Sequence, residues 1–391
     1  MPKESTDERK TSFERRQSSE NKATIVTYRD DFAKREITEL AEAAGYSVQA
    51  LLPQKIVLKS EYGVGVGKAA ELFEIVSDND SKTLIIDEEL TSSQANNLSK
   101  VTHVEVIDRD RLILNIFAKR ATTTEAKLQV QLAELKYEMP RARDAVRYSV
   151  DGERAGFSGM GESAVDVKFM ALKRQMVTVK QKLVKAQSFR KLQRVERRKL
   201  DLPFVSLAGY TSSGKTTLFN RLATESKEES PNLFTTLTTT TRAVSLGDSR
   251  RRVMLSDTVG FISRLPTYMV ESFRSTLEEL TYADLILLLL DASENEEAMQ
   301  IKLQSCLDTL EQLEVDSKKV LLILNKIDLV ENQRARTIEE EPLFKDLSVV
   351  KISAVSGTGL HQLRNRILSA THGSNASPTG EPPASIGQVS T

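Results

Sequence analysis

The chain has 391 residues, with 55 basic and 55 acidic side chains and 39% hydrophobic residues. This length suits two or three domains, and the single cysteine, Cys306, excludes an internal disulfide and a thiolate zinc site. With no leading apolar stretch and no apolar run of roughly 20 residues, the sequence favours a cytoplasmic protein without a membrane span. The zero net charge, taken alone, argues against binding to nucleic acid.

The two ends of the chain are expected to be disordered tails. Residues 1–22 mix basic and acidic side chains with few apolar ones, and residues 372–391 carry Gly, Pro and Ser but no Lys or Arg. Such segments cannot bury enough apolar surface to offset the entropy lost on ordering.

Residues 23–120 alternate short apolar runs with helical patterns. Strands are expected at 23–27, 55–58, 83–87 and 104–107, and helices at 31–44, 68–76 and 92–100. This alternation predicts an N-terminal α/β domain with a mostly parallel sheet. The glycine run at 63–67 could belong to a second nucleotide site, but a strand-to-helix turn is the favoured interpretation.

Residues 121–200 have a different, helical periodicity. Leucine and methionine recur at helical spacing from Leu128 to Met139, where Pro140 is expected to end the helix. After a glycine-containing loop, a heptad seam follows, formed by Val165, Phe169, Leu172, Met176, Val179, Leu183 and Ala186. The pattern predicts a two-helix, coiled-coil-like arm.

Residues 201–371 return to strand–helix alternation and open with a glycine loop. Residues 209–216 follow an apolar strand at 202–208, fit the pattern G-x-x-x-x-G-K-[ST], and lead into a helical sequence. The glycines allow a tight turn whose N–H groups point at phosphate, and the helix N-terminus adds a positive dipole end. Lys215 is therefore expected on the β- and γ-phosphates, with Thr216 as a ligand of Mg²⁺.

Three further motifs follow at the ends of successive expected strands. Asp257 can hold Mg²⁺ through water, and the amide of Gly260 can meet the γ-phosphate. Asp328 can accept both the ring N–H and the exocyclic amine of guanine, while Lys326 packs on the base plane. A backbone amide in Ser353–Val355 can reach guanine O6. The order of these motifs predicts guanine rather than adenine as the base.

A mobile switch segment is expected between the phosphate loop and Asp257. Phe234–Arg242 supplies it, with six threonines that could complete the Mg²⁺ shell and sense the γ-phosphate. Spacing alone does not choose among the threonines.

These motifs resemble the HflX family of translation-associated GTPases, within the Obg–HflX group. The resemblance covers about residues 23–371, and its marks are Gly209–Thr217, Phe234–Arg242, Leu255–Ile262, Leu265–Pro266, Ser272–Glu279 and Ala283–Asp284. In the N-terminal half they are Asp108–Arg109, Ile113–Leu114, Ile116–Ala118, Arg120–Ala121, Gln129–Val130, Leu132–Ala133, Leu135 and Tyr137.

The resemblance implies an N-terminal α/β domain over 23–120, an arm over 121–200 and a C-terminal phosphate-loop GTPase domain over 201–371. It further implies that Thr236 is the switch threonine, that GTP is hydrolysed, and that the partner is the large ribosomal subunit with its rRNA; some bacterial members split ribosomes. Ser212 and Ser213 depart from the family's Asn-Ala, which places potassium stimulation in doubt, and the arm loop at 156–162 is abbreviated.

The expected site residues follow from the motifs and the resemblance together. Catalytic roles fall to Lys215, Thr236 and Gly260, and metal binding falls to Thr216, Thr236 and, through water, Asp257. The nucleotide-binding set comprises Gly209, Tyr210, Thr211, Ser212, Ser213, Gly214, Lys215, Thr216, Thr217, Phe234, Thr235, Thr236, Leu237, Thr238, Asp257, Thr258, Val259, Gly260, Asn325, Lys326, Ile327, Asp328, Ser353, Ala354 and Val355.

Two features predict dependence on a partner. Phe261 follows Gly260 and has no polar atom to orient water, so hydrolysis by the isolated protein should be slow. Residues 168–199 carry twelve basic residues and one acid, Glu196, so the neutral total hides a basic arm. The expected RNA contacts are Lys173, Arg174, Lys180, Lys182, Lys185, Arg190, Lys191, Arg194, Arg197 and Arg198.

The sequence leaves a second function open. The chain could be a signalling switch that is read by a protein effector, with the arm as a dimerisation element, although a monomer is the expected state. Whether a ribosome-binding form splits ribosomes, rescues stalled ones or aids assembly is also left open.

Overall fold

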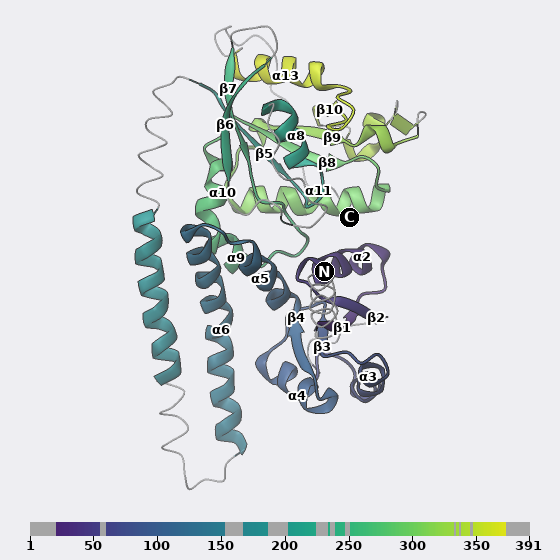
Figure 1. Cartoon of the computed structure of the whole chain (residues 1–391), viewed down its shortest axis with the longest axis vertical. Coiled ribbons are helices and arrows are strands. Elements are labelled where there is room, and N and C mark those ends of the chain that lie inside the picture. The colour runs from purple at the N-terminus through teal and green to yellow at the C-terminus, as the bar shows by residue number, and fades with distance from the viewer. Residues whose placement is uncertain are drawn as a thin grey trace, which may run out of the picture. The chain divides into compact units, whose positions relative to one another are not determined.

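The computed structural model describes residues 21–54, 60–152, 167–186, 202–223, 234, 239–246, 251–331, 334–335, 338–344 and 347–372 (Figure 1). The chain divides into two units, residues 1–119 with 127–183, and residues 120–126 with 184–391. Both contain a parallel sheet with helices, which confirms the predicted α/β class. In the described part of the chain, no helix combines the length and the apolar character needed to cross a bilayer.

The first unit contains a four-stranded sheet in the order β2-β1-β3-β4, with every pair parallel. Its strands are β1 (Lys22–Thr27), β2 (Ser47–Pro53), β3 (Thr83–Ile86) and β4 (Glu105–Asp108). Its helices are α2 (Asp31–Ala43), α3 (Val66–Asp78), α4 (Ser92–Thr102) and α5 (Arg109–Arg120). The sequence missed β2 and α5, and the strand expected at 55–58 lies outside the described residues.

The miss at β2 has a physical reason. The strand lies at the sheet edge, and none of its residues is fully buried, so it lacks the continuous apolar run that marks β1 and β3.

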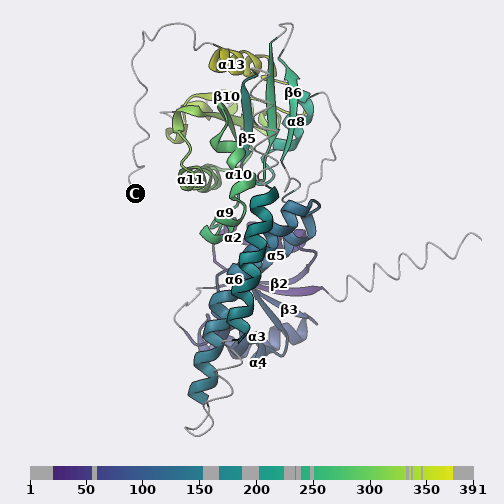
Figure 2. The same ribbon diagram turned by 90° about the vertical axis from the view of Figure 1, so that its left-hand side faces the viewer.

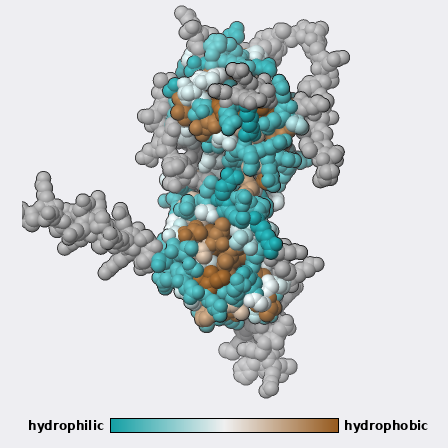
Figure 3. Space-filling view, turned by 90° about the vertical axis from the view of Figure 1, so that its right-hand side faces the viewer, coloured by the Kyte–Doolittle hydropathy of each residue, from teal (hydrophilic) through white to brown (hydrophobic). Residues whose placement is uncertain are grey.

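Figure 3 shows hydrophobic residues gathered on one face of this unit. Val66 and Phe73 of α3 are among its exposed apolar side chains.

A buried ion cluster joins α5 to the rest of this unit. Arg109, at 2% exposure, donates from Nη1 to Asp87 Oδ1 at 2.7 Å and from Nη2 to Glu36 Oε2 at 2.6 Å. Thr27 donates to the other oxygen of Asp87 at 2.6 Å. Burial disfavours the guanidinium charge, but the carboxylates of Glu36 and Asp87 outweigh it and raise the pKa of Arg109.

The arm consists of α6 (Thr124–Gly152) and a helix over 167–186, which run side by side in Figure 1 and overlap in the turned view of Figure 2. Their shared core contains Leu132, Leu135, Ala142, Leu172, Val179 and Leu183, and Met176 packs against it, so four of the predicted seam residues pack together. The prediction that Pro140 ends the first helix was wrong, because α6 continues through it. Met139 and Ala142 pack in the seam on either side of Pro140, and this packing offsets the lost hydrogen bond.

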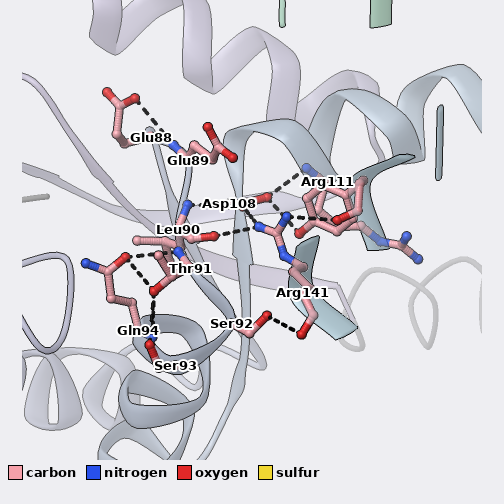
Figure 4. Close-up of polar contacts among 11 residues, drawn as sticks. Glu88, Glu89, Leu90, Thr91, Ser92, Ser93, Gln94, Asp108, Arg111 and Arg141 are labelled. Carbon is pink, nitrogen blue, oxygen red and sulfur yellow. Dashed lines mark hydrogen bonds and ion pairs between the residues drawn. The ribbon is translucent and has the colours of Figure 1, made fainter. Parts of the chain in front are cut away.

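A polar cluster fastens α6 to the loop that follows β3 (Figure 4). The Asp108 carboxylate accepts from the Leu90 N–H at 3.2 Å, from the Tyr137 hydroxyl at 3.0 Å and from Arg141. Arg141 also donates to the Leu90 carbonyl at 2.7 Å and lies 3.5 Å from the centre of the Tyr137 ring. Both backbone groups of Leu90 are therefore bonded within this cluster.

The second unit contains a six-stranded sheet in the order β10-β9-β8-β5-β7-β6, parallel except where β6 meets β7. The strands are β5 (Phe204–Gly209), β6 (Thr240–Ser245), β7 (Arg252–Asp257), β8 (Leu285–Asp291), β9 (Val320–Asn325) and β10 (Val349–Lys351). The helices are α8 (Lys215–Ala223), α9 (Thr267–Ser272), α10 (Arg274–Thr281), α11 (Glu296–Gln312) and α13 (Leu360–His372). Short 3₁₀ turns are η1 (Ser317–Lys319), η2 (Ile327–Leu329), η3 (Ile338–Glu340) and η4 (Pro342–Phe344).

Candidate functional site

The loop between β5 and α8 has a backbone that glycine alone accommodates at two positions. Gly209 and Gly214 have φ angles of +143° and +92°. An added Cβ would lie 2.3 Å from the Leu289 carbonyl at the first and 2.2 Å from Asn325 Nδ2 at the second. The loop is therefore a tight turn that ends at the N-terminus of α8, the arrangement that presents backbone N–H groups to phosphate.

Lys215, the first residue of α8, folds back over this loop. Its ammonium donates to the carbonyls of Gly209 at 3.0 Å and Tyr210 at 2.6 Å, and the side chain is buried. Burial lowers the pKa of Lys215 to about 8, while the nearby Asp257 carboxylate acts in the opposite direction. The residue expected to meet phosphate thus lies at the loop, beside the end of β7.

The two described candidate metal ligands lie in contact. Thr216 Oγ1 donates to Asp257 Oδ2 at 3.1 Å, and Asp257 is fully buried. Mg²⁺ prefers oxygen ligands and keeps several waters, so a hydroxyl and one carboxylate suit it when substrate phosphates complete the shell. Among the described residues, no group of three or more His, Cys, Asp or Glu side chains could hold a metal ion.

The segment after β7 lies directly on the phosphate loop. The Phe261 carbonyl accepts from the Thr211 N–H at 2.8 Å, and the Phe261 N–H donates to the Gly209 carbonyl at 3.0 Å. A Cβ on Gly260 would lie 3.1 Å from Lys215 Nζ, so the chain approaches the lysine closely there. The Phe261 side chain is 1% exposed and packs in the interior.

Asn325, at the end of β9, connects two loops of the site. Its Nδ2 donates to the Ser213 carbonyl at 2.8 Å, and its Oδ1 accepts from the Ala354 N–H at 3.0 Å. Ser353 is buried, whereas Val355, two residues later, is 71% exposed. Sequence reasoning placed Asn325 in the site but missed this bridge.

Lys326 and Asp328 are the residues expected to face the base. Lys326 has a φ of +63° and donates to Asp291 Oδ2 at 2.6 Å. The Asp291 Oδ1 atom accepts from both the amide and the hydroxyl of Ser293, so the carboxylate that holds Lys326 is itself held. Asp328 lies in η2 and is exposed. No sequence motif marks Asp291 beyond its position at the end of β8.

Some of the expected site residues lie outside the residues that the structure describes. Thr235, Thr236, Leu237 and Thr238 lie outside the described residues, whereas Phe234 is buried with a φ of +56°. Of the expected RNA contacts, Lys173, Arg174, Lys180, Lys182 and Lys185 are exposed on the helix over 167–186. The others, Arg190, Lys191, Arg194, Arg197 and Arg198, lie outside the described residues.

The glycine run of the first unit forms a turn before α3. Gly63 has a φ of +69° and packs so closely that a Cβ would lie 2.6 Å from Leu90 Cδ2. Gly65 and Gly67 face open space, and the adjoining loop after β3 begins with Asp87 and Glu88. The positive φ and close packing of Gly63 support the interpretation as a turn.

A mostly parallel sheet, a glycine loop and a helix that begins Lys-Thr define a phosphate-loop nucleotide-binding protein. Three family models match successive parts of the chain. They are described as GTP-binding GTPase N-terminal (residues 33–118), GTP-binding GTPase middle region (120–197) and 50S ribosome-binding GTPase (204–326). Curated relatives named GTPase HflX, which are at least 33% identical over most of this chain, show that it belongs to the HflX family of GTPases.

Two curated relatives named GTPase HflX span most of this chain. The protein of Thermococcus kodakarensis is 41% identical over 336 residues, which is 84% of this chain and 76% of the relative. That of Escherichia coli K12 is 33% identical over 356 residues, covering 90% and 82% respectively. Among solved structures, the complex of SsGBP with GDP is 28% identical and covers 91% of this chain and 99% of its own, with a TM-score of 0.52.

Proposed function

We propose that this protein binds GTP and GDP with Mg²⁺ and hydrolyses GTP to GDP and phosphate. The observation that carries the proposal is the bridge of Asn325 between the phosphate loop and the loop at Ser353–Val355. One buried side chain thereby fixes the phosphate-binding and base-binding loops relative to each other. Membership of the HflX family and the GDP complex of the related SsGBP support the same function.

In the proposed mechanism the protein supplies position and charge rather than a covalent intermediate. Lys215 and the loop amides stabilise the negative charge that develops on the phosphates. Thr216, Thr236 and, through water, Asp257 would hold Mg²⁺, which neutralises phosphate charge when bound. The amide of Gly260 meets the γ-phosphate.

Partner dependence follows from the residue after Gly260. Phe261 is buried, has no polar side-chain atom, and has both backbone groups bonded to the phosphate loop. It therefore cannot orient the attacking water. We expect slow hydrolysis that accelerates when a partner orders or supplies the group that orients water; turnover of about 10 s⁻¹ by the isolated protein would contradict this.

We assign guanine selection to Asp328, with Lys326 packing on the base plane; Asp291, which accepts from Lys326 at 2.6 Å, would orient that lysine. Asp328→Asn replaces one acceptor of the carboxylate by an amide donor, which suits the additional carbonyl of xanthine. GDP affinity should fall at least about tenfold while affinity for xanthosine diphosphate rises, as measured by calorimetry. An unchanged preference for GDP would remove Asp328 from the base site.

We further propose that the arm binds rRNA of the large ribosomal subunit. Residues 167–186 carry six basic side chains and no acid, and the five expected contacts among them are all exposed. Such a surface suits RNA phosphates, and the family model described as 50S ribosome-binding GTPase supports this partner.

A co-sedimentation assay with separated subunits and analogues of GTP and GDP tests this partner. Changing Lys173, Arg174, Lys180 and Lys182 to Gln should weaken binding and flatten its salt dependence. As a control, Lys100 and Lys318, which are exposed outside the arm, are changed to Gln and compared with an arm variant that changes only Lys173 and Lys180, so that both variants lose two charges. If the arm variant binds as the parent does, the arm is not the contact; if the parent binds no particle and dimerises through the arm, the signalling alternative is favoured.

A further inference from the structure

Tyr210, the second residue of the phosphate loop, directs its side chain into the protein. It is 3% exposed, and its hydroxyl oxygen accepts a hydrogen bond from the Ser263 N–H at 2.7 Å. The ammonium of Lys302, from α11, lies 4.9 Å from the centre of its ring and is paired with Glu294. A cation over the face of a buried ring favours that ring position. Any contact of Tyr210 with nucleotide must therefore come from its backbone.

The hydroxyl bond completes an attachment that the backbone begins. Phe261 is bonded through both backbone groups to Gly209 and Thr211, on either side of Tyr210. Ser263, two residues further along, is buried and bonded to the Tyr210 side chain. The segment Gly260–Ser263 is consequently fixed to the phosphate loop at two separate points.

We propose that Tyr210 is a positioning residue for GTP hydrolysis, which holds Gly260–Ser263 so that the Gly260 amide is placed at the γ-phosphate. This inference rests on the proposed GTPase function. A backbone attachment at Phe261 alone leaves the chain free to pivot there, whereas the bond at Ser263 opposes that rotation. Gly260 lies close to Lys215, because a Cβ added to Gly260 would be 3.1 Å from Lys215 Nζ. A small rotation of the segment would therefore move the Gly260 amide away from the phosphate site.

Tyr210→Phe tests the hydroxyl alone, because phenylalanine retains the ring beneath Lys302. The variant removes the hydroxyl that accepts from the buried Ser263 N–H, which favours displacement of the segment. The rate of single-turnover GTP hydrolysis should fall about tenfold, which corresponds to the change in activation free energy expected from losing one hydrogen bond between uncharged groups. The dissociation constant of a non-hydrolysable GTP analogue should rise severalfold. That of GDP, which has no γ-phosphate, should stay within about twofold.

Tyr282→Phe is the matched control, because Tyr282 is 46% exposed and lies after α10 in the same unit. The control should leave hydrolysis and both affinities unchanged, and thermal unfolding of both variants reports on folding. Two results for Tyr210→Phe would show a purely structural role and overturn the proposal. One is an equal loss of affinity for GDP and for the GTP analogue; the other is a lower unfolding temperature with an unchanged rate of GTP hydrolysis. If the parent protein hydrolyses GTP and Tyr210→Phe hydrolyses it at the same rate, the inference about Tyr210 is overturned and the proposed function stands. If the parent protein binds neither nucleotide, the proposed function is overturned as well.

Discussion

Replacing Asn325 by alanine tests the connection that carries the proposed function. The side chain is 1% exposed, donates to the Ser213 carbonyl at 2.8 Å and accepts from the Ala354 N–H at 3.0 Å. Alanine removes both bonds and leaves two backbone groups without these partners. The phosphate loop and the loop at Ser353–Val355 then lose their common support.

The size of the effect follows from these two bonds. A net hydrogen bond contributes about 1 kcal/mol, and a buried group left unsatisfied costs about 1–3 kcal/mol. For two bonds we expect a loss of about 2–4 kcal/mol, shared between folding and nucleotide binding. If binding loses about 2 kcal/mol, the dissociation constant of GDP rises about thirtyfold.

Calorimetric titration with GDP measures this change, and denaturant unfolding measures the part lost from stability. The matched control is Asn365→Ala, because Asn365 is exposed on α13 of the same unit. If Asn325→Ala binds GDP within about threefold of the parent and unfolds at the same denaturant concentration, the bridge contributes little and the reasoning is refuted.

Three further predictions concern other parts of the chain. Arg109→Met should lower the free energy of unfolding by about 3–5 kcal/mol, because it removes the guanidinium that neutralises the buried carboxylates of Glu36 and Asp87; adding Glu36→Gln should recover part of this loss in the same denaturant titration. Arg141→Met keeps the apolar stem but removes the bonds to the β3–α4 loop, so amide hydrogen exchange in that loop should accelerate, and unchanged exchange would contradict the assigned contacts. Burial raises the pKa of the Cys306 thiol to about 12, so at pH 8 a thiol reagent should label it at the rate of unfolding; immediate labelling of the native protein would argue against this burial.

The sequence determined the α/β class, the heptad seam of the arm and the order of the nucleotide motifs, because each is a local pattern. A glycine loop after an apolar strand and polar residues at strand ends can be recognised without knowing which strands are neighbours. The Lys215–Thr216 pair, Asp257 and the Asn325–Asp328 segment could therefore be proposed as site residues from the sequence. The edge strand β2 was missed because its partial burial leaves no clear periodicity.

Tertiary structure alone decided which distant groups pair. Asn325 bonds to a residue 112 positions away, and the Tyr210 hydroxyl bonds to one 53 positions away. Local periodicity reports which face of an element is apolar, but it does not report which polar atom will satisfy another across the fold. For the same reason Pro140 was misjudged: its local cost is visible in the sequence, whereas the seam packing that keeps α6 continuous comes from another helix.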